Sequence, residues 1–155
     1  MFLMRIVAQR CRKASVLVED KIVGKIDQGL VLLVGFTQGD SSIEIDYLVD
    51  KVLHLRVFDD EFGVMNRSLL DVGGSILSVS QFTLYADTKK GRRPSYVKAL
   101  NGEQAIKLYH QFNQKLESYS VLVEKGIFGA DMQIDFVNDG PVTILLEKER
   151  EEDGE

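Results

Sequence analysis

The sequence predicts an α+β domain with a mostly antiparallel, barrel-like β-sheet and two main helices. Three observations lead to this fold class. Short segments rich in β-branched residues recur along the chain, two other segments have the apolar spacing of a helix, and the two kinds are grouped rather than alternating. The length of 155 residues fits one domain.

The N-terminal part of the chain is predicted to form β-strands. Ile6–Cys11 and Ser15–Val18 are short β-branched segments, and Ile22–Ile26 follows a polar turn, which predicts a hairpin. Leu30–Phe36 is a continuous apolar run bounded by glycines, which is typical of a buried strand.

Two helices are expected. Residues 41–44 (Ser-Ser-Ile-Glu) form a capping-box pattern, and the apolar positions that follow have helical spacing: Ile45, Leu48, Val49 and Val52. The second helix carries one apolar stripe: Ala105, Leu108, Tyr109, Phe112 and Leu116. His54 falls at a helix end and His110 lies off the stripe, so surface positions are favoured over a metal site for both.

The remaining strands are expected between these helices and after the second one. They are Leu55–Phe58, Ile76–Leu84 after a turn at 71–74, a segment at 119–124, and finally Met132–Val137 and Val142–Leu146, separated by a turn at 138–141.

Composition excludes several classes of protein. A single cysteine rules out an intrachain disulfide, no cofactor motif is present, and the longest apolar run is too short to span a membrane. We therefore expect a cytoplasmic protein without metal, cofactor or membrane contact. The net charge of −5 comes mostly from residues 147–155, which we expect to be a disordered acidic tail after a domain at 1–146.

Ser80, Gln81, Phe82 and Thr83 are candidate site residues because hydroxyls and an amide interrupt an apolar strand. By strand alternation, Gln81 and Thr83 share one face, and Ser80 and Phe82 the other. Composition alone favours a half-buried strand whose hydroxyls face water. The functional alternative is a strand end that presents a hydroxyl and backbone N–H groups to a ligand.

Two further segments are candidates. The Gly140-Pro141 pair is either a tight turn before a strand or a rigid turn that exposes main-chain atoms. The loop after Leu84 is strongly basic, which fits either a solvated loop or phosphate binding. Its relevant residues are Lys89, Lys90, Arg92 and Arg93.

Taken together, the ordered motifs resemble the D-aminoacyl-tRNA deacylases over nearly the whole chain. The matching segments are Gln9-Arg10, Ala14-Ser15-Val16, Ser80-Gln81-Phe82-Thr83-Leu84, Arg93-Pro94-Ser95, Phe128-Gly129-Ala130-Asp131-Met132 and Asn138-Asp139-Gly140-Pro141-Val142-Thr143.

The resemblance implies hydrolysis of the ester between a D-amino acid, or mischarged glycine, and the 3′-terminal adenosine of tRNA. It implies a homodimer in which a cis Gly140–Pro141 turn, held by Arg10, enters the partner's pocket and excludes L side chains. The adenosine would lie near Phe128 and Met132, and the phosphates near the basic loop.

The mechanism is left open by the residues. Backbone N–H groups near Phe82 and Thr83 would stabilise the oxyanion, with water oriented by Thr83 or by the substrate's 2′-hydroxyl. We favour this non-covalent route over an acyl-enzyme on Thr83. The competing functions are a non-enzymatic RNA-binding β-domain and a threonine esterase acting on small esters.

Overall fold

The computed structural model describes residues 2–149, and one curled sheet dominates them. The sheet has the strand order β2-β1-β3-β6-β7, and β8 pairs with β1 on its other side. Strand β1 (Phe2–Val18) is antiparallel to its three partners, β2 (Lys21–Ile26), β3 (Gly29–Gly35) and β8 (Gln133–Glu149). Strand β6 (Ser75–Ser80) runs parallel to both β3 and β7 (Val123–Lys125), so the sheet is mixed.

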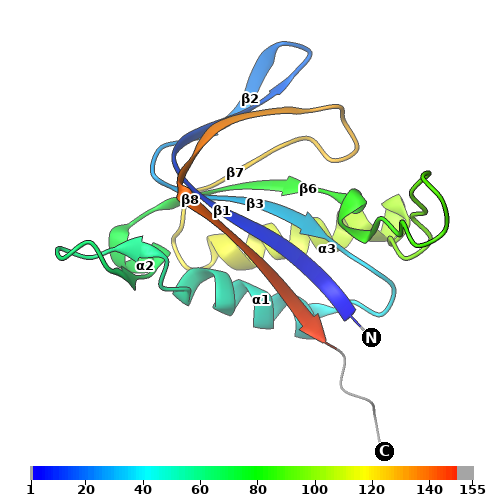
Figure 1. Cartoon of the computed structure of the whole chain (residues 1–155), viewed down its shortest axis with the longest axis horizontal. Helices are drawn as coiled ribbons and strands as arrows, with labels where there is room; N and C mark the ends of the chain where they lie inside the picture. The colour runs from blue at the N-terminus through cyan, green and yellow to red at the C-terminus, as the bar shows by residue number, and fades with distance from the viewer. Residues whose placement is uncertain (1, 150–155) are drawn as a thin grey trace, which may run out of the picture.

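The two main helices cover one face of this sheet (Figure 1). Helix α1 (Ser42–His54) begins with the expected capping box, in which Ser41 and Glu44 each accept a backbone N–H of the other. Helix α3 (Gly102–Glu117) is capped by Asn101. Their apolar stripes pack on alternate residues of β1 and β3, including Ile6, Leu32 and Val34, to form the larger core.

A smaller apolar cluster fills the inside of the curl. It consists of Cys11, Ala14, Val16, Ile26, Val31, Leu77 and Val79. Met132, just before β8, and Ile134 and Phe136 at the start of β8 pack against it. Because this end of the sheet folds over itself, the molecule has the expected barrel-like shape (Figure 1). Within residues 2–149, no helix is long and apolar enough to cross a membrane.

Several expected boundaries were wrong. The two short strands expected before residue 19 are one strand, β1, and the two expected after residue 131 are one strand, β8. Side-chain alternation could not reveal this, because the β1–β8 register shifts between Gln9 and Ala14 and the chain continues through the irregularity. The end of β8 also includes residues 147–149 of the acidic segment, and residues 150–155 lie outside the described residues.

The segment after α1 also differs from expectation. The strand expected at 55–58 is reduced to β4 (Phe58–Asp59), which forms a small hairpin with β5 (Met65–Arg67). The turn expected at 71–74 is the end of a short helix, α2 (Leu69–Val72), which stops at Gly73 in the left-handed conformation.

Candidate functional site

A pocket of about 370 Å³ lies where β3 and β6 end, beside the loop that precedes β8. Five of the predicted site residues line it: Ser80, Gln81, Phe82, Phe128 and Met132. Its walls are mainly apolar, and its size is within the range of small-molecule sites. The structure therefore brings together two sequence segments that are separated by helix α3.

The strand predicted to run to Leu84 ends at Ser80, and a short 3-10 helix, η1 (Phe82–Tyr85), follows. The predicted alternation of faces was wrong for this reason, since Ser80, Gln81 and Phe82 all line the same pocket. Thr83 does not line it, but its exposed hydroxyl accepts a hydrogen bond from the Gln81 side-chain amide. The first N–H groups of a short helix have no partner within it, so those of Phe82 and Thr83 are the backbone donors that η1 offers beside the pocket.

Tyr109 of α3 supports the wall of the pocket that contains Phe128. Its ring lies 5.9 Å from that of Phe128, and its hydroxyl donates to the Ser78 backbone carbonyl at 2.7 Å. The same carbonyl accepts the Gly126 N–H at 3.1 Å, so one atom of β6 holds both the helix and the loop that carries Phe128. The position of Tyr109 in the apolar stripe of α3 predicts only a core residue, so the sequence does not reveal this supporting role.

The basic loop leaves the same end of the sheet. Asp87 and Ser95 exchange two backbone hydrogen bonds, of 2.8 and 2.9 Å, and close the loop at its base. Between them Lys89, Lys90, Arg92 and Arg93 are all exposed. The Phe82 ring packs edge-on against Tyr96, with centroids 5.0 Å apart, so the base of the loop is joined to the pocket wall.

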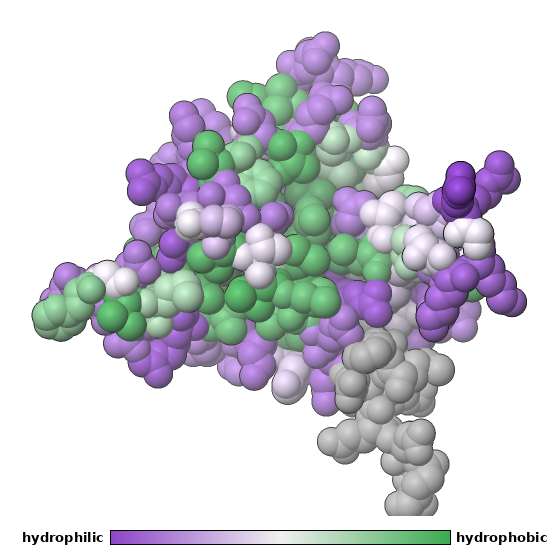
Figure 2. Space-filling model, viewed as in Figure 1, coloured by the Kyte–Doolittle hydropathy of each residue, from purple (hydrophilic) through white to green (hydrophobic). Residues whose placement is uncertain are grey.

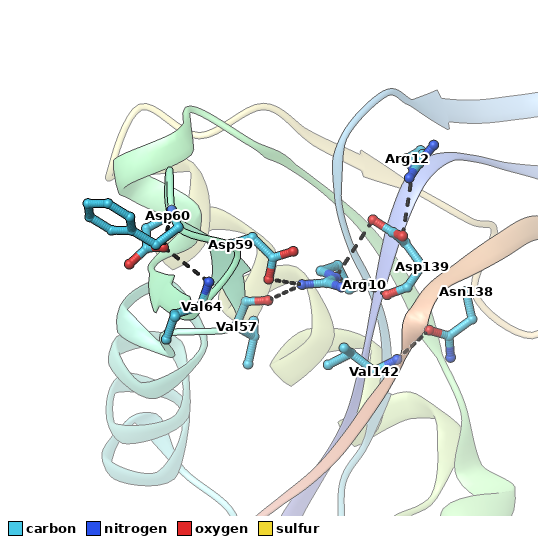
Figure 3. Close-up of polar contacts among 10 residues, drawn as sticks. Arg10, Arg12, Val57, Asp59, Asp60, Val64, Asn138, Asp139 and Val142 are labelled. Carbon is cyan, nitrogen blue, oxygen red and sulfur yellow. Dashed lines mark hydrogen bonds and ion pairs between the residues drawn. The ribbon is translucent and has the colours of Figure 1, made fainter.

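Gly140 and Pro141 lie elsewhere in the chain and are not among the described residues that line this pocket. Both are exposed, their peptide bond is cis, and Gly140 has a φ of 136°. The Asn138 side chain accepts the Val142 N–H at 2.8 Å and so closes the turn. Figure 3 shows Arg10 beside Asp139, where the guanidinium contacts the turn, and Asp59 and Val57 on its other side.

Other reactive side chains lie away from the pocket. His54 ends α1 with its Nδ1 2.9 Å from the Asp50 carbonyl, and His110 is exposed on α3. Burial raises the pKa of the Cys11 thiol to about 11, which keeps it protonated. In the described part of the chain, no three His, Cys, Asp or Glu side chains form a metal-ligand group.

Known proteins that are similar to this chain in sequence are described as deacylases of aminoacyl-tRNA. The family model described as "D-Tyr-tRNA(Tyr) deacylase" matches residues 7–147. A D-aminoacyl-tRNA deacylase from Halalkalibacterium halodurans is 53% identical over 144 residues, which cover 93% of this chain and 99% of that protein.

Solved structures show the same fold. The structure titled "c-Myc DNA Unwinding Element Binding Protein" is 39% identical, with a TM-score of 0.89 over 94% of this chain and 99% of its own. A probable eukaryotic D-amino acid tRNA deacylase superposes with a TM-score of 0.82 over 96% and 100% of the two chains, at 19% identity.

Proposed function

This chain belongs to the D-Tyr-tRNA(Tyr) deacylase family, and we propose that it removes D-amino acids from tRNA in a site shared by two subunits. It is a hydrolase of the aminoacyl-tRNA ester bond. Water adds to the ester carbonyl, the ribose oxygen leaves with a proton, and free amino acid and tRNA are the products. The pocket formed by η1 and the 126–132 loop carries this assignment.

The pocket offers a place for the 3′-terminal adenosine. Phe128 and Met132 supply an apolar wall, and Phe82 faces the same space. Aromatic and thioether groups pack well against a base, because each base has a polarisable flat face. The exposed basic loop beside Phe82 then lies where the phosphates of the 3′ strand would pass.

In the proposed mechanism, backbone N–H donors stabilise the transition state. The N–H groups of Phe82 and Thr83 would stabilise the negative charge that develops on the ester oxygen, a contribution of about 3 kcal/mol per donor in other hydrolases. The Thr83 hydroxyl, fixed by Gln81, or the substrate's 2′-hydroxyl would orient the attacking water. Neither histidine lines the pocket, so no imidazole base activates Thr83 there, which favours the non-covalent route over an acyl-enzyme.

Selection of D over L substrates requires a wall that excludes one enantiomer, and we propose that a second chain supplies it. Gly140 and Pro141 expose main-chain atoms, and Arg10 and Asn138 hold them in one conformation. We infer that this turn enters the pocket of a second copy, where its carbonyls meet the substrate's amino group and exclude an L side chain. Glycine has no side chain to exclude, so glycyl-tRNA would also be hydrolysed.

An apolar sheet face supports a homodimer. Val7 pairs with Leu33 on one side and Leu145 on the other, and these residues point away from the face that the helices cover. Leu145 is 57% exposed in the single chain. Figure 2 shows apolar residues gathered over the central strands, a surface that a second copy would bury.

Single-turnover assays with matched D- and L-tyrosyl-tRNA test this function. We expect the wild-type protein to release D-tyrosine rapidly and to leave L-tyrosyl-tRNA intact. The Thr83→Ala variant should hydrolyse D-tyrosyl-tRNA more slowly but keep the preference for D over L. Thr83→Ser, which retains the hydroxyl, is the matched control. Binding of tRNA without ester hydrolysis would instead support the RNA-binding alternative, and a trapped acyl-enzyme would support the esterase. A tRNA substrate would place the protein in the cytoplasm.

A further inference from the structure

Helix η1 is fixed to the sheet by two side chains that lie outside the pocket. Arg5 Nη1 of β1 donates to the Leu84 backbone carbonyl at 2.6 Å. The Tyr85 hydroxyl donates to the Gly35 backbone carbonyl, at the end of β3, at 3.0 Å. These two bonds join the C-terminal end of η1 to the neighbouring strands β1 and β3, while Phe82 at its N-terminal end lines the pocket.

The packing around these bonds is close. A Cβ on Gly35 would lie 2.8 Å from Tyr85 Cε2 and 3.1 Å from the Gln81 carbonyl oxygen, so only glycine lets η1 approach β3 this closely. The Arg5 guanidinium lies 5.2 Å from the centre of the Tyr85 ring, and its Nε is 3.3 Å from a Glu147 carboxylate oxygen. Tyr85 is only 4% exposed. Burial raises the pKa of its hydroxyl well above the ordinary value, so the group stays a neutral donor.

We propose that Arg5 and Tyr85 are positioning residues for ester hydrolysis, because they set the place and direction of the Phe82 and Thr83 N–H groups without touching the substrate. This inference rests on the proposed role of η1 in oxyanion stabilisation. Displacement of a catalytic group by about 1 Å can cost on the order of a hundredfold in rate. Loss of one of the two anchors is therefore expected to lower kcat and leave substrate binding by the pocket and basic loop intact.

The test compares Tyr85→Phe and Arg5→Ala with wild-type protein on D-tyrosyl-tRNA. We expect kcat to fall about tenfold or more in each variant while KM changes less than about twofold. Arg5→Lys should recover part of the lost rate, because an ammonium can still donate to the Leu84 carbonyl. Tyr119→Phe, beyond the end of α3, removes an exposed tyrosine hydroxyl as the matched control and should behave like wild type.

Amide hydrogen exchange separates positioning from general destabilisation. The Leu84 and Ala86 N–H groups bond to carbonyls of Gln81 and Thr83, so their exchange should accelerate in Tyr85→Phe. Amides of the β1–β3 ladder should keep wild-type protection.

Wild-type kcat in both Tyr85→Phe and Arg5→Ala would overturn the inference, as would an equal loss of protection in η1 and in the sheet. A wild-type protein that releases no amino acid would contradict the proposed function instead. Exchange at Leu84 and Ala86 would still decide whether the two side chains hold η1.

Discussion

Arg10 Nε donates a hydrogen bond of 2.9 Å to the backbone carbonyl of Asp139, the residue that precedes Gly140 (Figure 3). From the same side chain, Nη1 donates to the Val57 carbonyl at 2.7 Å. Arg10 is 8% exposed, so water does not readily replace it. One buried cation on β1 therefore joins the Gly140–Pro141 turn to the segment after α1.

Replacement of Arg10 by alanine should destabilise the fold and abolish D-aminoacyl-tRNA hydrolysis. Two carbonyls would lose a charged donor, at an expected cost of about 2–3 kcal/mol in the free energy of unfolding. Arg10→Lys should lose less, since one ammonium can still serve one carbonyl. Urea denaturation followed by circular dichroism measures the cost, and a change below about 0.5 kcal/mol would show that Arg10 does not hold the turn.

Gly140→Ala should impair both stability and activity. Gly140 has a φ of 136°, and an added Cβ would lie 2.8 Å from Val142 Cγ2 and 3.0 Å from the Val142 nitrogen. The expected cost is about 1–3 kcal/mol, together with loss of activity. Gly63→Ala is the matched control, because Gly63 also has a positive φ (75°) but open space around its Cα. If both variants remain fully active, the turn has no part in the reaction.

Removal of charge from the basic loop should weaken tRNA binding. A Lys89→Ala/Arg92→Ala double variant should raise KM and reduce the slope of log KM against log salt concentration by about one per lost phosphate contact, with kcat little changed. Lys51→Ala/Lys115→Ala removes the same charge from α1 and α3 and should leave KM and the slope unchanged. Equal slopes in the two double variants would show that the loop is only solvated.

The stability of the fold should depend on Asp40 between about pH 4 and pH 6. Burial raises the pKa of this carboxyl to about 6, so the folded protein holds its proton more tightly than the unfolded chain does. This group therefore stabilises the fold at low pH, and its contribution is lost as pH rises through about 6. Asp40→Asn keeps an acceptor for the Thr37 N–H and should be at least as stable as wild type at pH 8. An identical pH profile of unfolding in both proteins would contradict this assignment.

Local rules predicted the two main helices, α1 and α3, and the buried strand that forms β3. The capping box at Ser41 and Glu44 formed as its residue types require, and the apolar stripe of α3 is buried. Each of these patterns depends only on residues that are close together in the sequence, so each can be recognised without knowledge of the rest of the fold.

The site needed information that only the tertiary structure contains. Segment 76–84 has the composition of a long strand, yet it becomes a 3-10 helix after Ser80, where Tyr85 reaches the Gly35 carbonyl and the absence of a side chain at Gly35 leaves room. In the same way, Phe128 is placed by the contact with Tyr109 and by the Ser78 carbonyl, from two distant elements. The motifs identified the residues, and the fold determined which of them share a pocket.

Complementation between two impaired subunits tests the shared site most directly. A Gly140→Ala subunit keeps an intact pocket, and a Gln81→Ala/Thr83→Ala subunit keeps an intact turn. Heterodimers of the two, co-expressed with different tags and purified by both, should each contain one complete site. We expect about half of the wild-type activity per dimer on D-tyrosyl-tRNA, well above the activity of either variant alone. A heterodimer no more active than the two variants alone, or a wild-type protein that is fully active as a monomer, would contradict the account.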